Sequence, residues 1–254
     1  MHNKKRLSTI ISVVLLGLIA VAFIFPFVWM VATSLKPTTE VFSLSPTGSR
    51  IAWDNYPSAL NSIPFGRVVL NSFIVSLAGA ALVVVVSVLS AYAFARLRFK
   101  GRDHLFMLFL GTLVLPQEVL VIPLYIGMQR MGLVNSYFAL IVPFAFGAFG
   151  AFLIRQFLMS LPLEFEEAAR IDGCSDWKIL TKILLPLLKA PITVVGVFAF
   201  IDYWSAFLWP LIVVNDSTLA TIPLGLQMFS GERGTDWGPL MAAVTMTTIP
   251  SILL

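Results

Sequence analysis

Nine charged residues lie in the 26 positions from Glu164 to Lys189, although the whole chain of 254 residues contains only 17 Lys and Arg and 13 Asp and Glu. This passage reads LEFEEAARIDGCSDWKILTKILLPL over residues 163–187. Acids and bases at this density can pair with one another, with water or with a partner protein. These residue types therefore indicate recognition, and the question is what they contact.

Two further acids stand in otherwise apolar runs and could contact a polar substrate. Glu118 follows Pro116 closely, and Asp202 precedes two aromatic residues. Carboxylates accept hydrogen bonds from hydroxyl groups, and aromatic rings pack on the apolar faces of sugars. Hydration at the membrane rim also explains Glu118, and an interhelical hydrogen bond or an interfacial aromatic belt also explains the others. The candidate substrate-pathway residues are Asn71, Glu118, Asp202, Tyr203 and Trp204.

Metal and nucleophile chemistry is not expected. The chain has one cysteine, Cys174, and two histidines, His2 and His104. We therefore predict no metal site, no internal disulfide and no catalytic residues. A membrane-embedded enzyme would need clustered nucleophiles, histidines or metal ligands, and the sequence shows none.

The elements that position the candidate residues are transmembrane helices. The composition is 58% hydrophobic and 12% charged, about half the charged fraction of a soluble domain. The long apolar runs reach or approach the roughly 20 residues that cross a bilayer. We predict an all-α membrane protein with six transmembrane helices, at about residues 8–35, 68–95, 105–128, 136–155, 189–214 and 238–254. A helix that ended at Leu254 would leave carbonyls unsatisfied in hydrocarbon, so we expect the sixth span to continue further.

The distribution of basic residues predicts the orientation of the chain. Twelve lie at one end of the predicted spans and five at the other. The twelve are Lys4, Lys5, Arg6, Arg96, Arg98, Lys100, Arg102, Arg155, Arg170, Lys178, Lys182 and Lys189, and the five are Lys36, Arg50, Arg67, Arg130 and Arg233. Cytoplasmic loops carry the excess of Lys and Arg. We therefore predict a cytoplasmic N-terminus, a cytoplasmic charged passage and no nucleic-acid partner.

The charged passage must lie outside the hydrocarbon, because nine charges at about 2.5 kcal/mol each would cost on the order of 20 kcal/mol there. Pro162 and the glutamates after it favour a helix start, and Gly173 favours its end. Ser175 can cap a second helix, which Pro186 ends or kinks. The first helix is too short to be stable alone. It packs either on this chain only or on another protein, and the spacing leaves both open.

The sequence lacks two features that would indicate how transport is driven. The sequence has no Gly-Lys-Ser or Gly-Lys-Thr P-loop, so we do not expect this chain to bind ATP itself. No internal repeat is visible, which disfavours the inverted-repeat architecture of many secondary transporters. A secondary carrier that uses Glu118 or Asp202 as an ion site is a remote alternative.

The charged passage resembles the EAA motif of ATP-binding-cassette importer permeases. EEAARIDG is followed after nine residues by ILLP, so Glu167, Ala168, Ala169, Gly173, Ile183, Leu185 and Pro186 occupy the positions of the motif. NYPSALNSIPFGRVVLNSFIVS, YAFARLRFKGRD, LPQEVLVIPLYIGMQRMGLVNSYFALIVP and FLWPLIVVNDSTLATIPLGLQMFSGERGTDWGPLMAA are similar to the carbohydrate-uptake group, which includes the smaller permease of the maltose transporter.

The resemblance implies a type I importer permease, with a cytoplasmic coupling helix between spans 4 and 5 inside a loop at residues 162–186. It implies a bacterial or archaeal inner-membrane protein with several partners. These are a second, homologous permease, a dimer of ATPase subunits that bind ATP and Mg, a periplasmic or lipoprotein solute-binding protein, a carbohydrate substrate and membrane lipids. No cofactor is expected in this chain.

The resemblance also implies roles for particular residues. The ATPase-coupling residues would be Glu167, Ala168, Ala169, Arg170, Asp172 and Gly173. The tip of the last outer loop, Gly231, Glu232, Arg233 and Gly234, would approach the solute-binding protein. Relatives often have Trp-Asn, an acid and Phe where this chain has Trp204-Ser205-Ala206-Phe207, which weakens the transfer of substrate contacts there.

The substrate stays open within the importer class. A sugar or polyol derivative is the main hypothesis, and glycerol phosphate or a glycerophosphodiester is the alternative. An anionic substrate would call for basic residues in the spans, and the apolar runs contain none. The paired permease could supply them.

Overall fold

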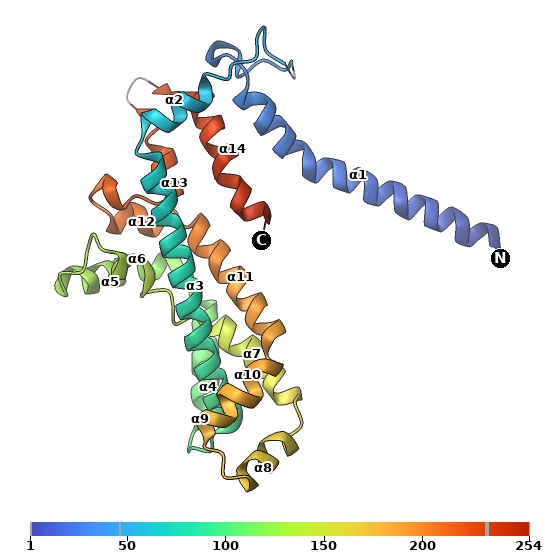
Figure 1. Cartoon of the computed structure of the whole chain (residues 1–254), viewed down its shortest axis with the longest axis vertical. Coiled ribbons are helices and arrows are strands. Elements are labelled where there is room, and N and C mark those ends of the chain that lie inside the picture. Colours follow the sequence, from blue (N-terminus) through green and yellow to red (C-terminus); the bar gives the residue numbers. More distant parts are fainter. Residues whose placement is uncertain (1, 46, 232–233, 254) are drawn as a thin grey trace. The chain divides into compact units, whose positions relative to one another are not determined.

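The computed structural model describes residues 2–45, 47–231 and 234–253, without the side chains of residues 2–8, 10 and 253. The chain forms two compact units: unit 1 comprises Met1–Gly66 and Gly225–Leu254, and unit 2 comprises Arg67–Leu224. Nearly all regular structure is helical (Figure 1), which confirms the predicted all-α class.

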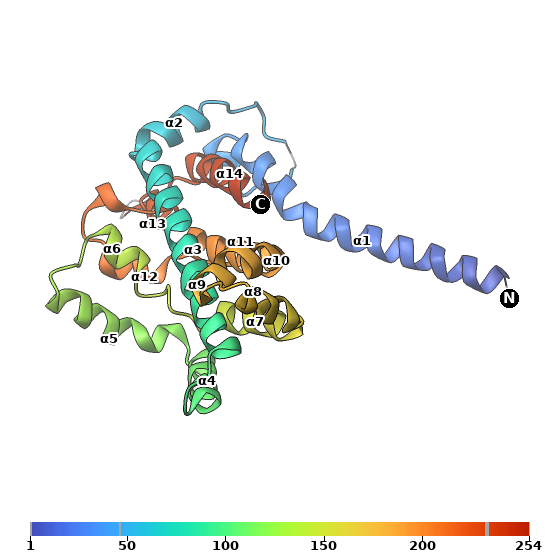
Figure 2. The same ribbon diagram turned by 60° about the horizontal axis from the view of Figure 1, so that its bottom comes forward.

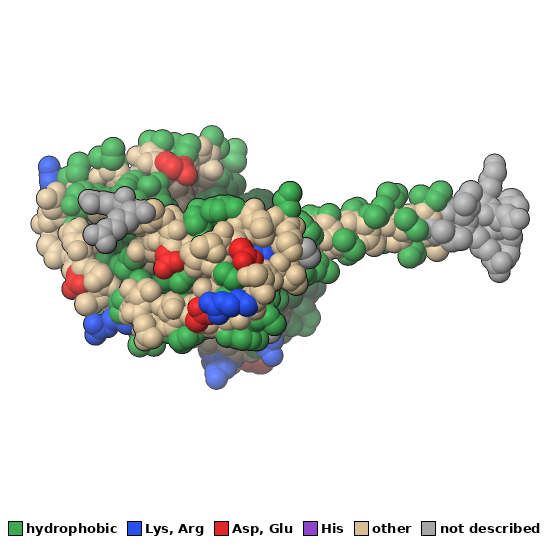
Figure 3. Space-filling view, turned by 90° about the horizontal axis from the view of Figure 1, so that it is seen from above, with side chains coloured by type: hydrophobic (Ala, Val, Ile, Leu, Met, Phe, Trp, Pro, Cys, Tyr) green, Lys and Arg blue, Asp and Glu red, His purple; other side chains and the backbone are tan. Residues whose placement is uncertain are grey.

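Unit 1 is built around the contact of two helices with α14. Its elements are α1 (His2–Ser34), η1 (Thr38–Glu40), α2 (Asn55–Ser62), β1 (Ser230–Gly231), β2 (Gly234–Thr235) and α14 (Trp237–Leu253). Both α1 and α2 pack on α14, around the buried side chains of Ala59, Ile63, Phe229, Ala242 and Ala243. Apolar side chains along α1 are exposed (Figure 3), as expected for a helix that faces lipid or another membrane protein.

The connection from α1 to α2 is held by buried polar contacts. Lys36 is fully buried; its Nζ donates to the carbonyl of Ser43 at 3.0 Å and lies 4.5 Å from the centre of the Trp29 ring. The amide of Asn55 donates to the carbonyls of Ser34 and Lys36. The buried cation therefore has a carbonyl and an aromatic face as partners, which offsets its desolvation.

Unit 2 contains the predicted substrate-pathway and ATPase-coupling residues. Its helices are α3 (Phe65–Arg96, which begins in unit 1), α4 (Arg102–Gly111), η2 (Thr112–Val114), α5 (Gln117–Arg130), α6 (Tyr137–Ile141), α7 (Ala148–Ser160), α8 (Glu164–Ile171), α9 (Asp176–Lys178), η3 (Ile179–Leu184), α10 (Leu185–Leu187), α11 (Lys189–Ser205), α12 (Leu208–Val213), η4 (Ser217–Leu219) and α13 (Ile222–Gln227, which continues into unit 1).

Helix α3 is the long central element of unit 2 (Figures 1 and 2). Its buried residues recur three and four positions apart, so they form one stripe along the helix. In unit 2 the stripe is Val68, Asn71, Ser72, Val75, Ser76, Gly79, Ala80, Ser87, Val88, Ala91 and Tyr92. Small side chains in this stripe allow close helix contact. A methyl group at Gly79 would lie 2.5 Å from the Tyr203 ring of α11.

The predicted third span, 105–128, is not one continuous helix. The pair α4–η2 meets α5 at a bend of 102°. Leu115 is extended and precedes Pro116, because the proline ring disfavours a helical conformation in the residue before it. The proline marked this position in the sequence, but the length of the apolar run suggested an unbroken helix.

The predicted fourth and fifth spans, 136–155 and 189–214, are interrupted as well. The fourth region contains short α6, a non-helical stretch and then α7, which begins only at Ala148. In the fifth, α11 ends at Ser205 and α12 follows after the extended residue Ala206. Pro210 has no N–H and its ring would clash with a helical carbonyl of Ala206, which disfavours a continuous helix at this point.

The other predicted spans correspond to single helices. Ile11–Ser34 and Phe65–Arg96 are each long and apolar enough to cross a membrane. Three bent helix pairs raise the number of candidate spans to five within the described residues. Helix α14, with 17 residues, occupies the position of the sixth predicted span.

Candidate coupling helix and candidate substrate cavity

Helix α8 begins and ends where its sequence predicts. Three glutamates occupy its first turn, where the helix dipole favours negative charge. Its end is closed by Gly173, whose φ of +76° is accessible to glycine without strain. The N–H of Cys174 donates to the carbonyl of Ala169, and that of Gly173 to the carbonyl of Arg170, which is the Schellman pattern. Ser175 then caps the next helix through Lys178, as predicted.

One face of α8 is anchored to unit 2. Its buried residues are Glu166 and Ala169, three positions apart and therefore on the same side of the helix. Ala169 joins a core with Tyr92 of α3 and Leu158 of α7. The carboxylate of Glu166 lies 2.5 Å from Nε of Arg96, the last residue of α3. Helix α8 follows α7 across a bend of 78° (Figures 1 and 2).

The other face of α8 has no partner within the described part of the chain. Glu167, Ala168, Asp172 and Gly173 are exposed, and so are several large apolar side chains. The exposed apolar side chains of this loop are Leu163, Phe165, Ile171 and Trp177. Arg170 is half exposed and pairs with Asp176 of the same loop at 2.7 Å. Exposed aromatic and aliphatic groups among charges are typical of a protein-binding surface.

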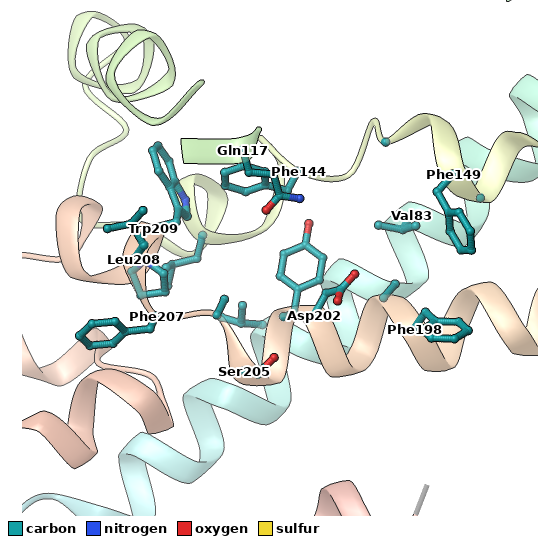
Figure 4. Close-up of a pocket in the computed structure, with 18 of the residues that line it drawn as sticks. Val83, Gln117, Phe144, Phe149, Phe198, Asp202, Ser205, Phe207, Leu208 and Trp209 are labelled. Carbon is teal, nitrogen blue, oxygen red and sulfur yellow. The ribbon is translucent and has the colours of Figure 1, made fainter. Parts of the chain in front are cut away.

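A cavity of about 410 Å³ lies elsewhere in unit 2, between α5, α7, α11 and α12. The Asp202 side chain points into this space from α11, opposite Gln117 at the start of α5 (Figure 4). Phe144, Phe198 and Trp209 contribute aromatic walls. The lining therefore combines carboxylate, amide and aromatic groups, which are the chemical groups that bind sugars and polyols.

The structure brings three of the five predicted pathway residues to this cavity. Glu118, Asp202 and Tyr203 line it, and they come from α5 and α11. Neither Glu118 nor Asp202 makes a hydrogen bond or ion pair to any residue that the structure describes, so both carboxylates are free to meet a ligand or water. The hydroxyl of Tyr203 donates to the carbonyl of Ile141, which fixes the orientation of the ring.

Asn71 and Trp204 lie away from the cavity lining. The Asn71 amide donates to the carbonyls of Thr218 and Ala220, each at 2.9 Å, and its oxygen accepts from Tyr137 at 2.6 Å. Its hydrogen bonds are thus made within the protein, and they tie α3 to α6 and to the segment that contains η4. Trp204 is buried, with its ring 4.8 Å from Phe73 in an edge-to-face contact.

The last predicted outer loop is a short hairpin in unit 1. Ser230 pairs with Thr235, and Gly231 pairs with Gly234. Gly234 has φ of +111°, which only glycine adopts readily. Glu232 and Arg233, the other two residues expected at this tip, lie outside the described residues.

Two site residues were missed in the sequence, Arg96 and Glu166. The spacing of Glu166 and Ala169 marks one inward face of α8, but no local pattern pairs Glu166 with a base 70 positions away. Gln117 and Trp209 of the cavity were missed for the same reason. They line the same cavity from α5 and α12, two helices that are far apart in the sequence.

No group of three or more His, Cys, Asp or Glu that could hold a metal ion occurs among the residues that the structure describes. The two candidate sites are the exposed face of α8 and the cavity between α5, α7, α11 and α12. Neither arrangement contains a nucleophile paired with a base.

Comparison with known proteins identifies the class to which this architecture belongs. Residues 83–254 match the family described as binding-protein-dependent transport system inner membrane component. The fold matches that of a bacterial ABC transporter involved in the import of the acidic polysaccharide alginate, with a TM-score of 0.86 over 98% of this chain and 94% of that chain at 23% identity.

Several curated permeases are similar over almost the full length. The sn-glycerol-3-phosphate transport system permease protein of Pectobacterium atrosepticum is 37% identical over 100% of this chain and 93% of its own length. The lactose transport system permease protein of Rhizobium radiobacter is 32% identical over 99% of this chain and 92% of its own length. The arabinooligosaccharides permease protein of Halalkalibacterium halodurans is 34% identical over 99% and 93%. The chain is therefore a multi-pass membrane transport subunit that belongs to the binding-protein-dependent transport system inner membrane component family.

Proposed function

We propose that this chain is one of two permease subunits of an ATP-driven importer for a carbohydrate, either an oligosaccharide or a sugar or polyol derivative. It forms half of the translocation pathway with a second, homologous permease. A dimer of ATPase subunits binds ATP and Mg and docks on α8, and a periplasmic or lipoprotein solute-binding protein delivers the substrate from the other side of the membrane.

The exposed face of α8 is the observation that carries this proposal. Phe165 and Ile171 are 52% and 86% exposed beside Glu167 and Asp172. A helix of eight residues is not stable alone, yet only its Glu166 and Ala169 side are used by this chain. The remaining face fits a cleft in a soluble partner, and an ATPase is that partner in a transport system of this family.

Ion pairs that join α3 to α8 and α4 to α7 support the proposed orientation of the chain in the membrane. The end of α3 contacts α8 through Arg96, and the start of α4 contacts α7 through Asp103 and Arg155. These connections hold most of the basic residues, which favour the cytoplasmic side. By the same rule the N-terminus, with Lys4, Lys5 and Arg6, faces the cytoplasm of a bacterial or archaeal cell, and the exposed apolar surface of α1 contacts lipid or the second permease.

The cavity supports a substrate rich in hydroxyl groups. Its free carboxylates can accept hydrogen bonds, and its aromatic rings can stack on a sugar. The lactose and arabinooligosaccharides relatives carry carbohydrate names. Because the lining includes no Lys, Arg or His, an anionic ligand would meet two acids and no base in this half of the pathway.

Glycerol phosphate, or a glycerophosphodiester, is the second candidate, because the Pectobacterium relative is named for it. A binding experiment on the partner solute-binding protein, which we expect to be encoded beside this chain, distinguishes the two candidates. We expect calorimetry to detect a neutral sugar or polyol. Binding of glycerol phosphate alone would reverse the order of the candidates.

Reconstitution tests the proposal as a whole. The chain is co-expressed with the neighbouring permease, ATPase and solute-binding protein and placed in liposomes. We expect uptake that requires ATP and the loaded binding protein, and no uptake without the ATPase. Uptake that persists without ATP and responds to a proton or sodium gradient would instead indicate the ion-driven carrier.

A further inference from the structure

Arg96 makes three contacts that join three elements at one end of unit 2. It is the last residue of α3. Its Nη2 donates to the carbonyls of Leu158 and Leu161 at the end of α7, at 2.7 and 3.2 Å. Its Nε lies 2.5 Å from the carboxylate of Glu166 on α8. That N–H is not aligned for a hydrogen bond with the carboxylate, so this contact is an ion pair.

Burial makes this pair different from the other ion pairs of the described chain. The side chains of Arg96 and Glu166 are 7% and 5% exposed, whereas those of Arg170 and Asp176 are each 50% exposed. A buried pair loses hydration that its attraction recovers only in good geometry, so its net contribution to stability is small. What it supplies is a fixed relative position of the elements that carry the two charges.

Apart from this pair, α8 itself contributes little to the core of unit 2. Ala169 supplies the only buried apolar side chain of the helix, and the nearby bond from the Tyr92 hydroxyl to the carbonyl of Asp176 is 3.4 Å long. An alanine in a core permits sliding, whereas a guanidinium that holds two carbonyls and a carboxylate does not.

We propose that Arg96 is a positioning residue for coupling, because it locks Glu166 of α8 to the ends of α3 and α7. A displacement of α8 by a docked ATPase then moves both spans, and a signal from the outer side reaches α8 along the same path. The proposal rests on the proposed function, since it assumes that α8 is the docking element.

The test uses the complete transporter in liposomes. Removing one partner leaves a buried charge unpaired and can prevent folding, so the main variant is the double substitution Arg96→Met with Glu166→Leu, which replaces the pair by apolar side chains of similar size. We expect the complex to assemble with basal ATP hydrolysis within about two-fold of wild type. Stimulation of hydrolysis by the loaded binding protein should fall about ten-fold, a usual size for a coupling between sites, and uptake should fall with it.

Two single substitutions sharpen the result. Arg96→Lys keeps the charge but lacks the planar guanidinium fork that reaches two carbonyls and the carboxylate from separate nitrogens, so we expect intermediate stimulation. Arg98→Met removes an exposed charge from the same turn and should leave stimulation within about two-fold. Full stimulation in the double variant would overturn the proposal.

Glu167→Ala distinguishes the docking role of α8 from the positioning role of Arg96, because Glu167 lies on the exposed face of α8. If Glu167→Ala abolishes coupling while the double variant is stimulated normally, the role of Arg96 is wrong and the docking role of α8 stands. If neither variant changes coupling, the docking role fails and the role of Arg96 fails with it.

Discussion

Two regions of unit 2 differ in how their functional groups are held: the coupling end, which is α8 with the end of α3, and the cavity end, which is the lining around Glu118 and Asp202. At the coupling end the acid Glu166 is paired and buried, and the glycine stop of α8 is closed by backbone hydrogen bonds. At the cavity end Glu118 and Asp202 have no partner among the described residues, and the helices around them are broken. In the proposed transporter, the first arrangement would hold α8 in a fixed position, and the second would leave two carboxylates open to a ligand.

The largest expected effect on uptake is at Gly173, just after the C-terminus of α8. Gly173→Val places a β-branched residue at φ of +76°, which costs at least about 1–2 kcal/mol. We expect this change to misdirect the docking face and lower uptake more than about ten-fold, as measured in reconstituted vesicles. Gly111→Val is the control, because Gly111 has φ of −56° and open space around it. Equal uptake in the two variants would show that the positive φ of Gly173 is not needed for uptake.

A smaller effect is expected at the free carboxylate of the cavity. Asp202→Asn keeps the shape but loses the charge, and hydrogen bonds to charged groups contribute about 1.5–3 kcal/mol. We expect the half-saturating substrate concentration for uptake to rise about ten-fold, with ATP hydrolysis still coupled. Thr193→Val on the same helix, whose hydroxyl bonds its own backbone, is the matched control. An unchanged concentration dependence would assign Asp202 a structural role only.

Helix contact at the cavity gives the next effect. In Gly79→Ala the added methyl group would lie 2.5 Å from the Tyr203 ring, and such overpacking costs about 1–3 kcal/mol. We expect a lower melting temperature in detergent and a few-fold loss of uptake as α11 shifts. Gly127→Ala, with nothing within 4 Å and a helical position that favours alanine over glycine, should melt at or above the wild-type temperature. If both variants melt together, the close contact of α3 with α11 is wrong.

The smallest effect on transport is expected at Asn71. Asn71→Ala removes three hydrogen bonds and leaves two carbonyls and a hydroxyl without their partner, which should destabilise the protein by about 1–3 kcal/mol. Uptake per folded complex should stay within about two-fold, because the side chain does not line the cavity. A specific change in substrate affinity would instead place Asn71 in the pathway.

The coupling end could be predicted from sequence because its signals are local. The glutamates, Gly173 and Ser175 lie within 12 positions and act through backbone geometry near themselves. The cavity could be predicted only in part. Glu118 and Asp202 were conspicuous as acids in apolar runs. Both line one cavity beside helix breaks at Leu115 and Ala206, which a count of apolar residues does not reveal.

Contacts between residues far apart in the sequence could not be predicted from local sequence patterns. Arg96 and Glu166 meet across 70 positions, and Asn71 and Tyr137 across 66. In each case one partner looked like an ordinary member of its segment: Arg96 was one base among several in a predicted cytoplasmic turn, and Tyr137 was one residue of the predicted span 136–155. Only the packing of α3 against the other helices selects the partner.

Cross-linking tests the central claim, that the exposed face of α8 seats in a separate ATPase. The chain has a single cysteine, Cys174, so Cys174→Ser gives a cysteine-free background in which Ala168→Cys places one thiol on that face. In the assembled transporter, a short bifunctional reagent should join this thiol to the ATPase, while the same reagent should not join a thiol introduced at buried Ala169. A thiol at position 168 that stays freely reactive with a soluble maleimide and forms no adduct with the ATPase would contradict the account.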